Sequence, residues 1–314
     1  YVWREVKNIL NPKSTNKITL RTGGGEVGDN KKVADTLNNY FITKIENLTN
    51  NINITDIENP VEKLKEKYKG RSPGNFQLRP VAEKDILKAL REMKLKKSSG
   101  PDGVSQELLK SLSQILSVPL TLIINTSIVS GKFPSPWKKA KITPIHKGGE
   151  LTDPKNYRPI SCIPSASKVL ESIVEKQVRK YYEDNHLFPK EQHGFRQSRS
   201  TTTALTSLIA EWIGNYEAGR HTGVLLWDLS AAFDTLNVDT FCQKLAIYGF
   251  QERSVRWFRT FLMNRQQRVH IEGESSEEIK TSTGSPQGSL LSPLIFLIYI
   301  MDIELWVDGI SIRR

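Results

Sequence analysis

Apolar side chains recur at helical spacing along much of the chain. The clearest pattern begins at Ala166 and ends at Tyr181, with Val169, Leu170 and Ile173 on the same face. A stripe of this width predicts an amphipathic helix that buries one face. Comparable patterns predict further helices near 2–10, 33–45, 86–93, 108–116, 193–212, 241–248, 255–262 and 292–301.

Three segments have the pattern of strands instead. Residues 137–147 alternate apolar and polar side chains up to a turn at Gly148 and Gly149, and an extended stretch at 156–164 follows, which indicates a hairpin. The apolar run that begins at Gly223 predicts a strand ending at Asp228. Residues 268–271 and 279–281 indicate a second, smaller hairpin. This mixture predicts an α+β fold rather than a doubly wound sheet.

Length and composition are those of a globular protein. With 314 residues and 38% hydrophobic content, the chain has room for two domains or for one with an extension. We expect a helical N-terminal extension and linker at 1–75, and one larger domain at 76–314. Cys162 and Cys242 are far apart, so neither a disulfide frame nor a zinc site is expected. The apolar stretch 290–301 is too short to cross a bilayer, so no membrane partner is expected.

Positive charge is concentrated in one part of the chain. The net charge is +11, and the segment 131–199 holds 14 Lys and Arg against 7 Asp and Glu. Such a segment suits a polyanionic partner. Contacts to phosphates supply affinity but do not read base sequence, so we expect weak, salt-sensitive binding of nucleic acid with little sequence preference.

Two short motifs carry the most specific signal. Asp228 lies in the string Trp-Asp-Leu-Ser-Ala-Ala-Phe-Asp, and some fifty residues later Gly284 opens the string Gly-Ser-Pro-Gln-Gly-Ser-Leu-Leu-Ser-Pro. Together they resemble motifs A and B of reverse transcriptases, most closely those of non-LTR (LINE-type) retrotransposons. The aromatic-Ala-Asp-Asp hairpin that completes the family's metal site is not in the sequence. Because the chain also starts at Tyr1, we expect a fragment of a longer product that is inactive alone.

The resemblance implies a right-hand polymerase, with fingers and part of the palm inside 76–314. The implied activity is RNA-directed DNA synthesis, in which dNTPs are added to a DNA primer on an RNA template with Mg²⁺ or Mn²⁺. The implied localisation is intracellular, in nucleus and cytoplasm as a ribonucleoprotein. Two-metal transfer needs clustered carboxylates, and hard cations prefer oxygen ligands. Asp228 and the carbonyl of Leu229 are therefore the expected metal ligands.

Further residues receive roles from the same resemblance. Phe233 corresponds to the aromatic steric gate that excludes a 2′-hydroxyl, whereas Asp234 is expected to be a helix-start or structural acid. Gln287 and Gly288 correspond to the element that contacts the nucleotide, where a glycine lets backbone approach closely. The other expected contacts are Lys147 and Arg158 with the triphosphate, and Arg196 and Arg199 along the template path.

Two other classes of function stay open at this stage. The chain could be a catalytically dead nucleic-acid-binding relic, or it could belong to a related enzyme such as an intron maturase or a viral RNA-dependent RNA polymerase. Viral RNA polymerases carry a different motif where this chain has Pro-Gln-Gly. The motif therefore favours a polymerase that uses deoxynucleotides.

Overall fold

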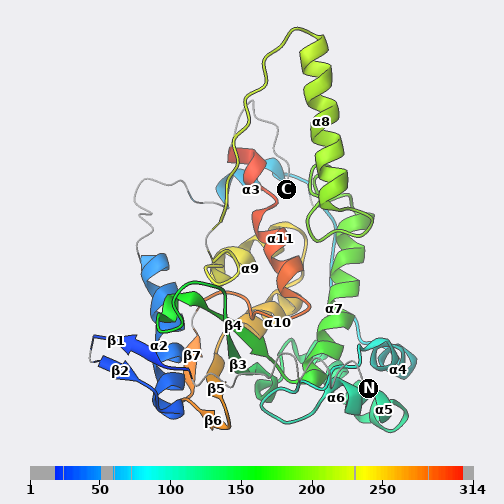
Figure 1. The fold of residues 1–314 in the computed structure, drawn as a ribbon. Coiled ribbons are helices and arrows are strands. Elements are labelled where there is room, and N and C mark those ends of the chain that lie inside the picture. Colours follow the sequence, from blue (N-terminus) through cyan, green and yellow to red (C-terminus); the bar gives the residue numbers. More distant parts are fainter. Residues whose placement is uncertain are drawn as a thin grey trace, which may run out of the picture.

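A computed structural model of the chain describes residues 18–306, apart from 24, 51–58, 60, 72, 230 and 282. The mixture of helices and strands is that of an α+β protein (Figure 1). The helix predicted at 2–10 lies outside the described residues. The helices are α2 (Asn30–Asn50), α3 (Glu62–Lys67), α4 (Glu83–Glu92), α5 (Gln106–Ser111), α6 (Ser113–Ser130), α7 (Ser165–Asp184), α8 (Thr201–Glu217), α9 (Val238–Ile247), α10 (Glu252–Leu262) and α11 (Ser292–Ile300). The strands are β1 (Leu20–Thr22), β2 (Gly25–Val27), β3 (Lys139–His146), β4 (Tyr157–Cys162), β5 (Arg265–Ile271), β6 (Glu274–Ser275) and β7 (Ile279–Thr281).

One five-stranded sheet organises the lower half of the molecule as drawn in Figure 1. Its order is β4-β3-β5-β6, with β7 pairing β5. The predicted hairpin is confirmed, because β3 and β4 are antiparallel from Lys141 opposite Cys162 to His146 opposite Tyr157. The smaller hairpin is confirmed as well, since β6 and β7 both run antiparallel to β5. Only β3 and β5 are parallel among the described pairs.

The main core lies among the helices. Helix α7 is its centre, and ten of its residues are buried, as its apolar stripe predicts. An aromatic cluster of Phe76, Tyr181 and Phe250 packs beside it, with ring centroids 4.4–5.7 Å apart. Trp257 is fully buried and donates its indole N–H to the Ser127 hydroxyl at 3.0 Å, so its polar atom is satisfied. Parts of α3, α4, α6, α9, α10 and α11 share this core.

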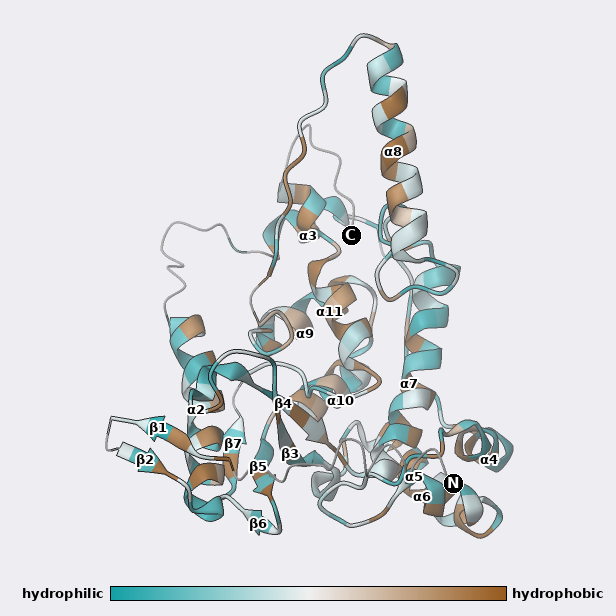
Figure 2. Ribbon diagram, in the orientation of Figure 1, coloured by the Kyte–Doolittle hydropathy of each residue, from teal (hydrophilic) through white to brown (hydrophobic). Residues whose placement is uncertain are grey.

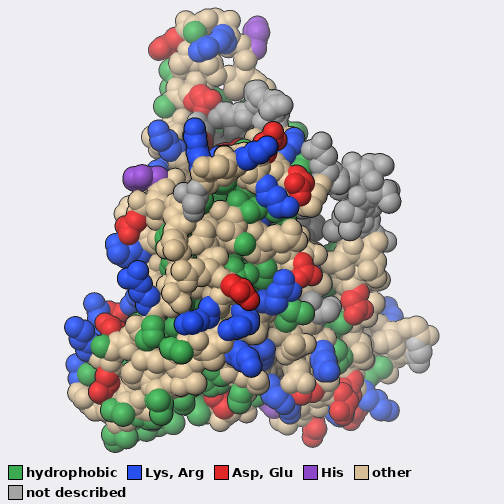
Figure 3. Space-filling view, turned by 180° about the vertical axis from the view of Figure 1, so that it is seen from behind, with side chains coloured by type: hydrophobic (Ala, Val, Ile, Leu, Met, Phe, Trp, Pro, Cys, Tyr) green, Lys and Arg blue, Asp and Glu red, His purple; other side chains and the backbone are tan. Residues whose placement is uncertain are grey.

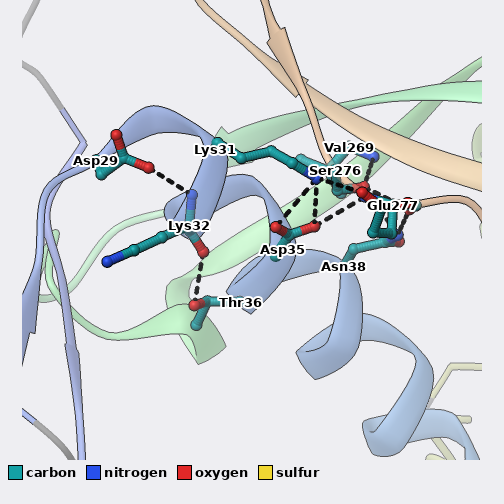
Figure 4. Close-up of polar contacts among 9 residues, drawn as sticks. All are labelled: Asp29, Lys31, Lys32, Asp35, Thr36, Asn38, Val269, Ser276 and Glu277. Atoms are coloured by element: carbon teal, nitrogen blue, oxygen red, sulfur yellow. Dashed lines mark hydrogen bonds and ion pairs between the residues drawn. The ribbon is translucent and has the colours of Figure 1, made fainter.

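A second core joins the N-terminal helix α2 to the sheet. Leu37 and Phe41 of α2 are buried together with Ile142 and Val269 of β3 and β5. The polar contacts beside this core are shown in Figure 4. Asn38, which is fully buried, donates to the Ser276 hydroxyl and the Glu277 carbonyl, both at 2.9 Å. Since buried amides must be hydrogen-bonded, these contacts fix α2 on the segment between β6 and β7.

Two helices carry apolar surface to the outside. Helix α6 is long and apolar enough to cross a membrane, yet a third of it is buried and it packs on α4 and α10. Helix α8 projects beyond the rest of the described molecule (Figure 1), and none of its residues is buried. Brown apolar patches follow its length in Figure 2. The exposed apolar side chains of α8 are Leu205, Ile209, Trp212, Ile213 and Tyr216.

Candidate functional site

The strand predicted to end at Asp228 does not form. Residues 221–229 have no regular secondary structure, and their apolar side chains from Val224 to Leu229 are 52–89% exposed. Figure 1 shows this segment as the extended chain that returns from the end of α8. A strand needs a neighbour to pair its backbone groups, and no described strand pairs with this segment. The predicted strand is therefore wrong for the described structure, because an apolar run forms a strand only where a neighbouring strand pairs with it.

The metal site expected at Asp228 is not complete in the part of the chain that the structure describes. No group of three or more His, Cys, Asp or Glu side chains there could hold an ion. Asp228 itself is exposed, and so is the adjoining Leu229. Mg²⁺ usually takes six oxygen ligands, several of them water, and two-ion sites need several carboxylates to offset the repulsion between the ions. The described residues supply one carboxylate and do not fit such a site by themselves.

The turn after Asp228 is ordered by contacts with distant parts of the chain. Ala231 has a positive φ of 51°, and its carbonyl accepts the Asp234 amide at 2.8 Å. The carbonyl of Phe233 accepts the Ser285 amide at 2.8 Å, which ties this turn to the start of the Pro-Gln-Gly loop. The Phe233 ring lies 4.9 Å from that of Phe296 on α11. Phe233 is thus held in a half-buried position at the junction of the two motifs.

Gln287 and Asp234 form the central pair of the site. The side-chain amide of Gln287 donates to both carboxylate oxygens of Asp234, at 2.9 and 2.8 Å. Burial raises the pKa of Asp234, against the effects of Gln287 and the nearby Lys44 charge. Asp234 is therefore engaged as a structural acid, as its sequence context indicates. Because the amide nitrogen of Gln287 faces Asp234, the amide oxygen of Gln287 faces away from that carboxylate and stays available as an acceptor.

Gly288 is required for a reason that the sequence did not indicate. It has a φ of +87°, which favours glycine, and a Cβ at this position would lie 2.6 Å from the carbonyl oxygen of Ser161. The close approach is therefore to strand β4 of the protein itself. A contact between Gly288 and a nucleotide stays a prediction.

Lys147 and Arg158 lie at the loop end of the β3–β4 hairpin. The Lys147 amide donates to the Asn156 carbonyl at 2.8 Å, and Arg158 pairs with Ile145 in the ladder. Both side chains are exposed. The strand that carries Arg158 also carries Ser161, which touches Gly288, so the hairpin and the Pro-Gln-Gly loop are neighbours. The two cations are free to reach an anionic ligand, and their role on a triphosphate remains untested.

Arg196 and Arg199 have different surroundings, although both were assigned to the template path. Arg196 is bound internally: it pairs with Glu183 at 2.8 Å, donates to the Pro189 carbonyl at 3.0 Å and lies over the Phe188 ring. Arg199 is exposed. Of the 14 basic residues in 131–199, six take part in ion pairs with described acids. Lys and Arg side chains nevertheless gather in the centre and along the left of the face in Figure 3.

The N-terminal helix α2 borders this site, which the sequence did not indicate. A pocket beside the Gln287–Asp234 pair is lined by Phe41 and Ile45 of α2 and by the buried Arg265. Burial lowers the pKa of Arg265 to about 10. No motif links α2 to the segments around Asp234 and Gln287, because the contact is made by ordinary apolar positions of a helix. Glu171 of α7 was also missed, and it binds the loop that carries Gln287.

Known proteins are similar to this chain over much of its length. Residues 145–310 match the family model described as reverse transcriptase (RNA-dependent DNA polymerase). Similar proteins from Drosophila melanogaster include the probable RNA-directed DNA polymerase from transposon BS, 26% identical over 96% of this chain, and the RNA-directed DNA polymerase from mobile element jockey, 28% identical over 73%. The chain spans 33% and 25% of the lengths of these two relatives. Because the family match covers more than half of the 314 residues, the chain belongs to the reverse transcriptase family.

Proposed function

We propose that this chain is the fingers and the first part of the palm of an RNA-directed DNA polymerase from a non-LTR retrotransposon. The observation that carries the proposal is the Gln287–Asp234 pair, which joins the motif after Asp228 to the Pro-Gln-Gly loop. Both motifs thereby meet beside the hairpin that carries Lys147 and Arg158. The whole enzyme would act as a ribonucleoprotein in nucleus and cytoplasm, with an RNA template, a DNA primer and dNTPs.

Each proposed role follows from the chemistry of its side chain. Lys147 and Arg158 would neutralise the triphosphate, since an ammonium and a guanidinium stabilise charge that develops on phosphate oxygens. Phe233 would stand below the sugar and exclude a 2′-hydroxyl by its bulk. Asp228 would be one of the carboxylates that hold Mg²⁺ or Mn²⁺, which activates and stabilises the reacting oxygens. The remaining acids of that site are not among the described residues.

Primer extension tests the proposal directly. The 314-residue chain should not extend oligo(dT) on poly(rA) with dTTP and Mg²⁺ or Mn²⁺, because one exposed carboxylate cannot hold two ions. A polypeptide that continues the natural reading frame past Arg314 to an Asp-Asp pair should extend the primer. Asp228→Ala should abolish that activity, whereas Asp239→Ala, which removes an exposed carboxylate paired with Arg259 on neighbouring helices, should not. Equal extension by the Asp228→Ala variant would exclude the proposed metal ligand.

A nucleic-acid-binding relic is the second candidate. It is favoured by the absence of a complete acid cluster among the described residues. The relic predicts salt-sensitive binding of primer–template but no extension by the longer polypeptide. An intron maturase would also synthesise DNA, and a viral RNA polymerase would incorporate rNTPs instead. Product analysis with dNTPs and with rNTPs therefore separates the polymerase classes.

A further inference from the structure

The loop that carries Gln287 rests on a buried carboxylate from a distant helix. Glu171 of α7 has no exposed surface. Its Oε2 accepts the Ser289 hydroxyl at 2.6 Å and the Leu290 amide at 2.7 Å. Its Oε1 accepts the Ser167 hydroxyl at 3.0 Å. Both carboxylate oxygens are thus engaged, and two of the three contacts hold the residues directly after Gly288.

Ser289 extends this contact into helix α11. Its hydroxyl oxygen accepts the Leu291 amide at 3.0 Å while its proton goes to Glu171. Ser292 completes the turn by donating its hydroxyl to the Pro286 carbonyl at 2.8 Å. The first amides of a helix have no intrahelical acceptor, and a negative charge near them is favourable. Glu171 therefore holds the two residues that precede the N-cap of α11, with an acceptor that belongs to another helix.

This contact has a free-energy cost that ordinary core packing does not have. Burial raises the pKa of Glu171, and the contacts with Ser289 and Leu290, the charge of Arg265 and the contact with Ser167 oppose that rise. A buried carboxylate is costly unless its oxygens are hydrogen-bonded, and an apolar residue would fill the same space without that cost. The side chain thus provides a directed link between α7 and the loop.

We propose that Glu171 is a positioning residue for the loop Pro286–Gly288, which it ties to α7 so that Gln287 is held in place. The other side of the loop is fixed by the Gln287–Asp234 pair and by the approach of Gly288 to Ser161. Glu171 acts through Gln287 and touches no substrate. The consequence for nucleotide binding rests on the proposed function, whereas the link between α7 and the loop does not.

The loop contains a matched pair of serines for the test. Ser285 and Ser289 are 4% and 7% exposed, but only Ser289 binds Glu171, and the Ser285 hydroxyl has no hydrogen-bond partner among the described residues. Ser289→Ala removes a hydroxyl that binds Glu171. Ser285→Ala removes a hydroxyl that does not bind Glu171. Glu171→Ala removes all three contacts. Glu171→Gln keeps an oxygen that can accept from Ser289 and Leu290.

Two measurements on the 314-residue chain read the loop directly. One is hydrogen exchange at the Leu290 amide, and the other is the NMR signal of the Gln287 side-chain amide, assigned by its loss in Gln287→Leu. Exchange should rise about tenfold or more in Glu171→Ala and several-fold in Ser289→Ala, given the strength of hydrogen bonds to charged groups. The Gln287 signal should shift in both variants. Glu171→Gln and Ser285→Ala should stay near the wild type in both measurements.

The outcomes separate this proposal from the polymerase proposal. If Glu171→Ala does not fold, the two serine variants decide. An unmoved Gln287 signal in Ser289→Ala, or equal exchange in Ser285→Ala and Ser289→Ala, overturns the positioning role. The positioning role is also overturned if the Gln287 signal of Glu171→Gln differs from that of the wild type. In that case an acceptor oxygen at position 171 would not be enough to hold the loop. Absence of primer extension by the longer polypeptide would instead exclude the polymerase assignment. The hydrogen-exchange and NMR results on the loop would not be affected.

Discussion

Helices α7 and α8 follow one another in the chain and have similar lengths, 20 and 17 residues, but opposite surroundings. Ten residues of α7 are buried, and none of α8 is. Both carry apolar side chains at helical spacing, so the difference does not come from their patterns. It comes from the elements that lie against them. Periodicity predicts that a helix has an apolar face, but not that another part of the described chain covers it.

The candidate site likewise has a buried part and an exposed part. Gln287 belongs to the well-packed side, where Asp234 and Glu171 hold its loop from two directions. Asp228 belongs to the exposed side, in the segment that returns from α8. The Pro286–Gly288 loop is therefore already formed, whereas the segment of the expected metal ligand lacks a supporting layer among the described residues.

Two matched leucines measure the difference between the helices. Leu170 on α7 is fully buried and Leu205 on α8 is 58% exposed. Leu170→Ala should lower the free energy of unfolding by about 2–5 kcal/mol, because it leaves a cavity in the core. Leu205→Ala should change it by about 0.5 kcal/mol or less. Urea unfolding followed by circular dichroism gives both values, and equal losses would mean that α8 is packed in solution.

Phe233 lies between the two regions, since its ring contacts Phe296 of α11 and Phe195 just before α8. In the polypeptide that extends primers, Phe233→Ala should relax exclusion of rNTPs by about ten- to a hundredfold, because a few kcal/mol of steric discrimination is lost. The measurement is kcat/KM for dTTP against UTP. Phe296→Ala is the companion variant: it removes the ring that packs on Phe233, so a relaxed ratio there as well would show that packing around Phe233 contributes. An unchanged ratio in Phe233→Ala would assign Phe233 to packing alone.

The exposed stripe of α8 should make the chain self-associate. Contiguous apolar surface of this kind favours association in water. Ile209→Lys combined with Ile213→Lys should weaken self-association about tenfold or more, because charges replace two exposed apolar side chains that association would bury. Sedimentation velocity over a range of concentrations measures this. Ser207→Lys with Ala210→Lys adds the same charge off the stripe, and an equal effect there would show that charge alone is responsible.

The smallest expected effect separates two arginines. Arg199→Ala should reduce the salt slope of nucleic-acid binding by about one, as loss of one phosphate contact would. Arg196→Ala should leave that slope nearly unchanged and lower stability instead, because its guanidinium is bound to Glu183 and Pro189. Fluorescence anisotropy with a labelled primer–template, at 50 to 200 mM salt, reads the slope. A larger change of slope in Arg196→Ala would reverse the assignment of the two residues.

Local patterns predicted most elements but not the contacts that build the site. The β3–β4 hairpin and the helix around Val169 follow from side-chain periodicity, which is a property of neighbouring residues. The Gln287–Asp234 pair joins residues 53 positions apart, and Glu171 meets Ser289 across 118 positions. Such contacts depend on how distant elements pack together, so a local sequence pattern does not predict them. The strand at Asp228 failed for the related reason that a strand requires a partner.

The attachment of α2 to the sheet has a consequence for synthesis of the protein. Asn38 binds Ser276, which follows it by 238 residues. At roughly 5–20 residues per second, the ribosome needs about 12–48 s to make that partner after it has made α2. During this interval Leu37 and Phe41 cannot pack on Val269, because β5 has not yet been translated. The apolar face of α2 therefore stays without this partner until β5 is made. Chaperones that bind exposed apolar segments would bind α2 during that interval.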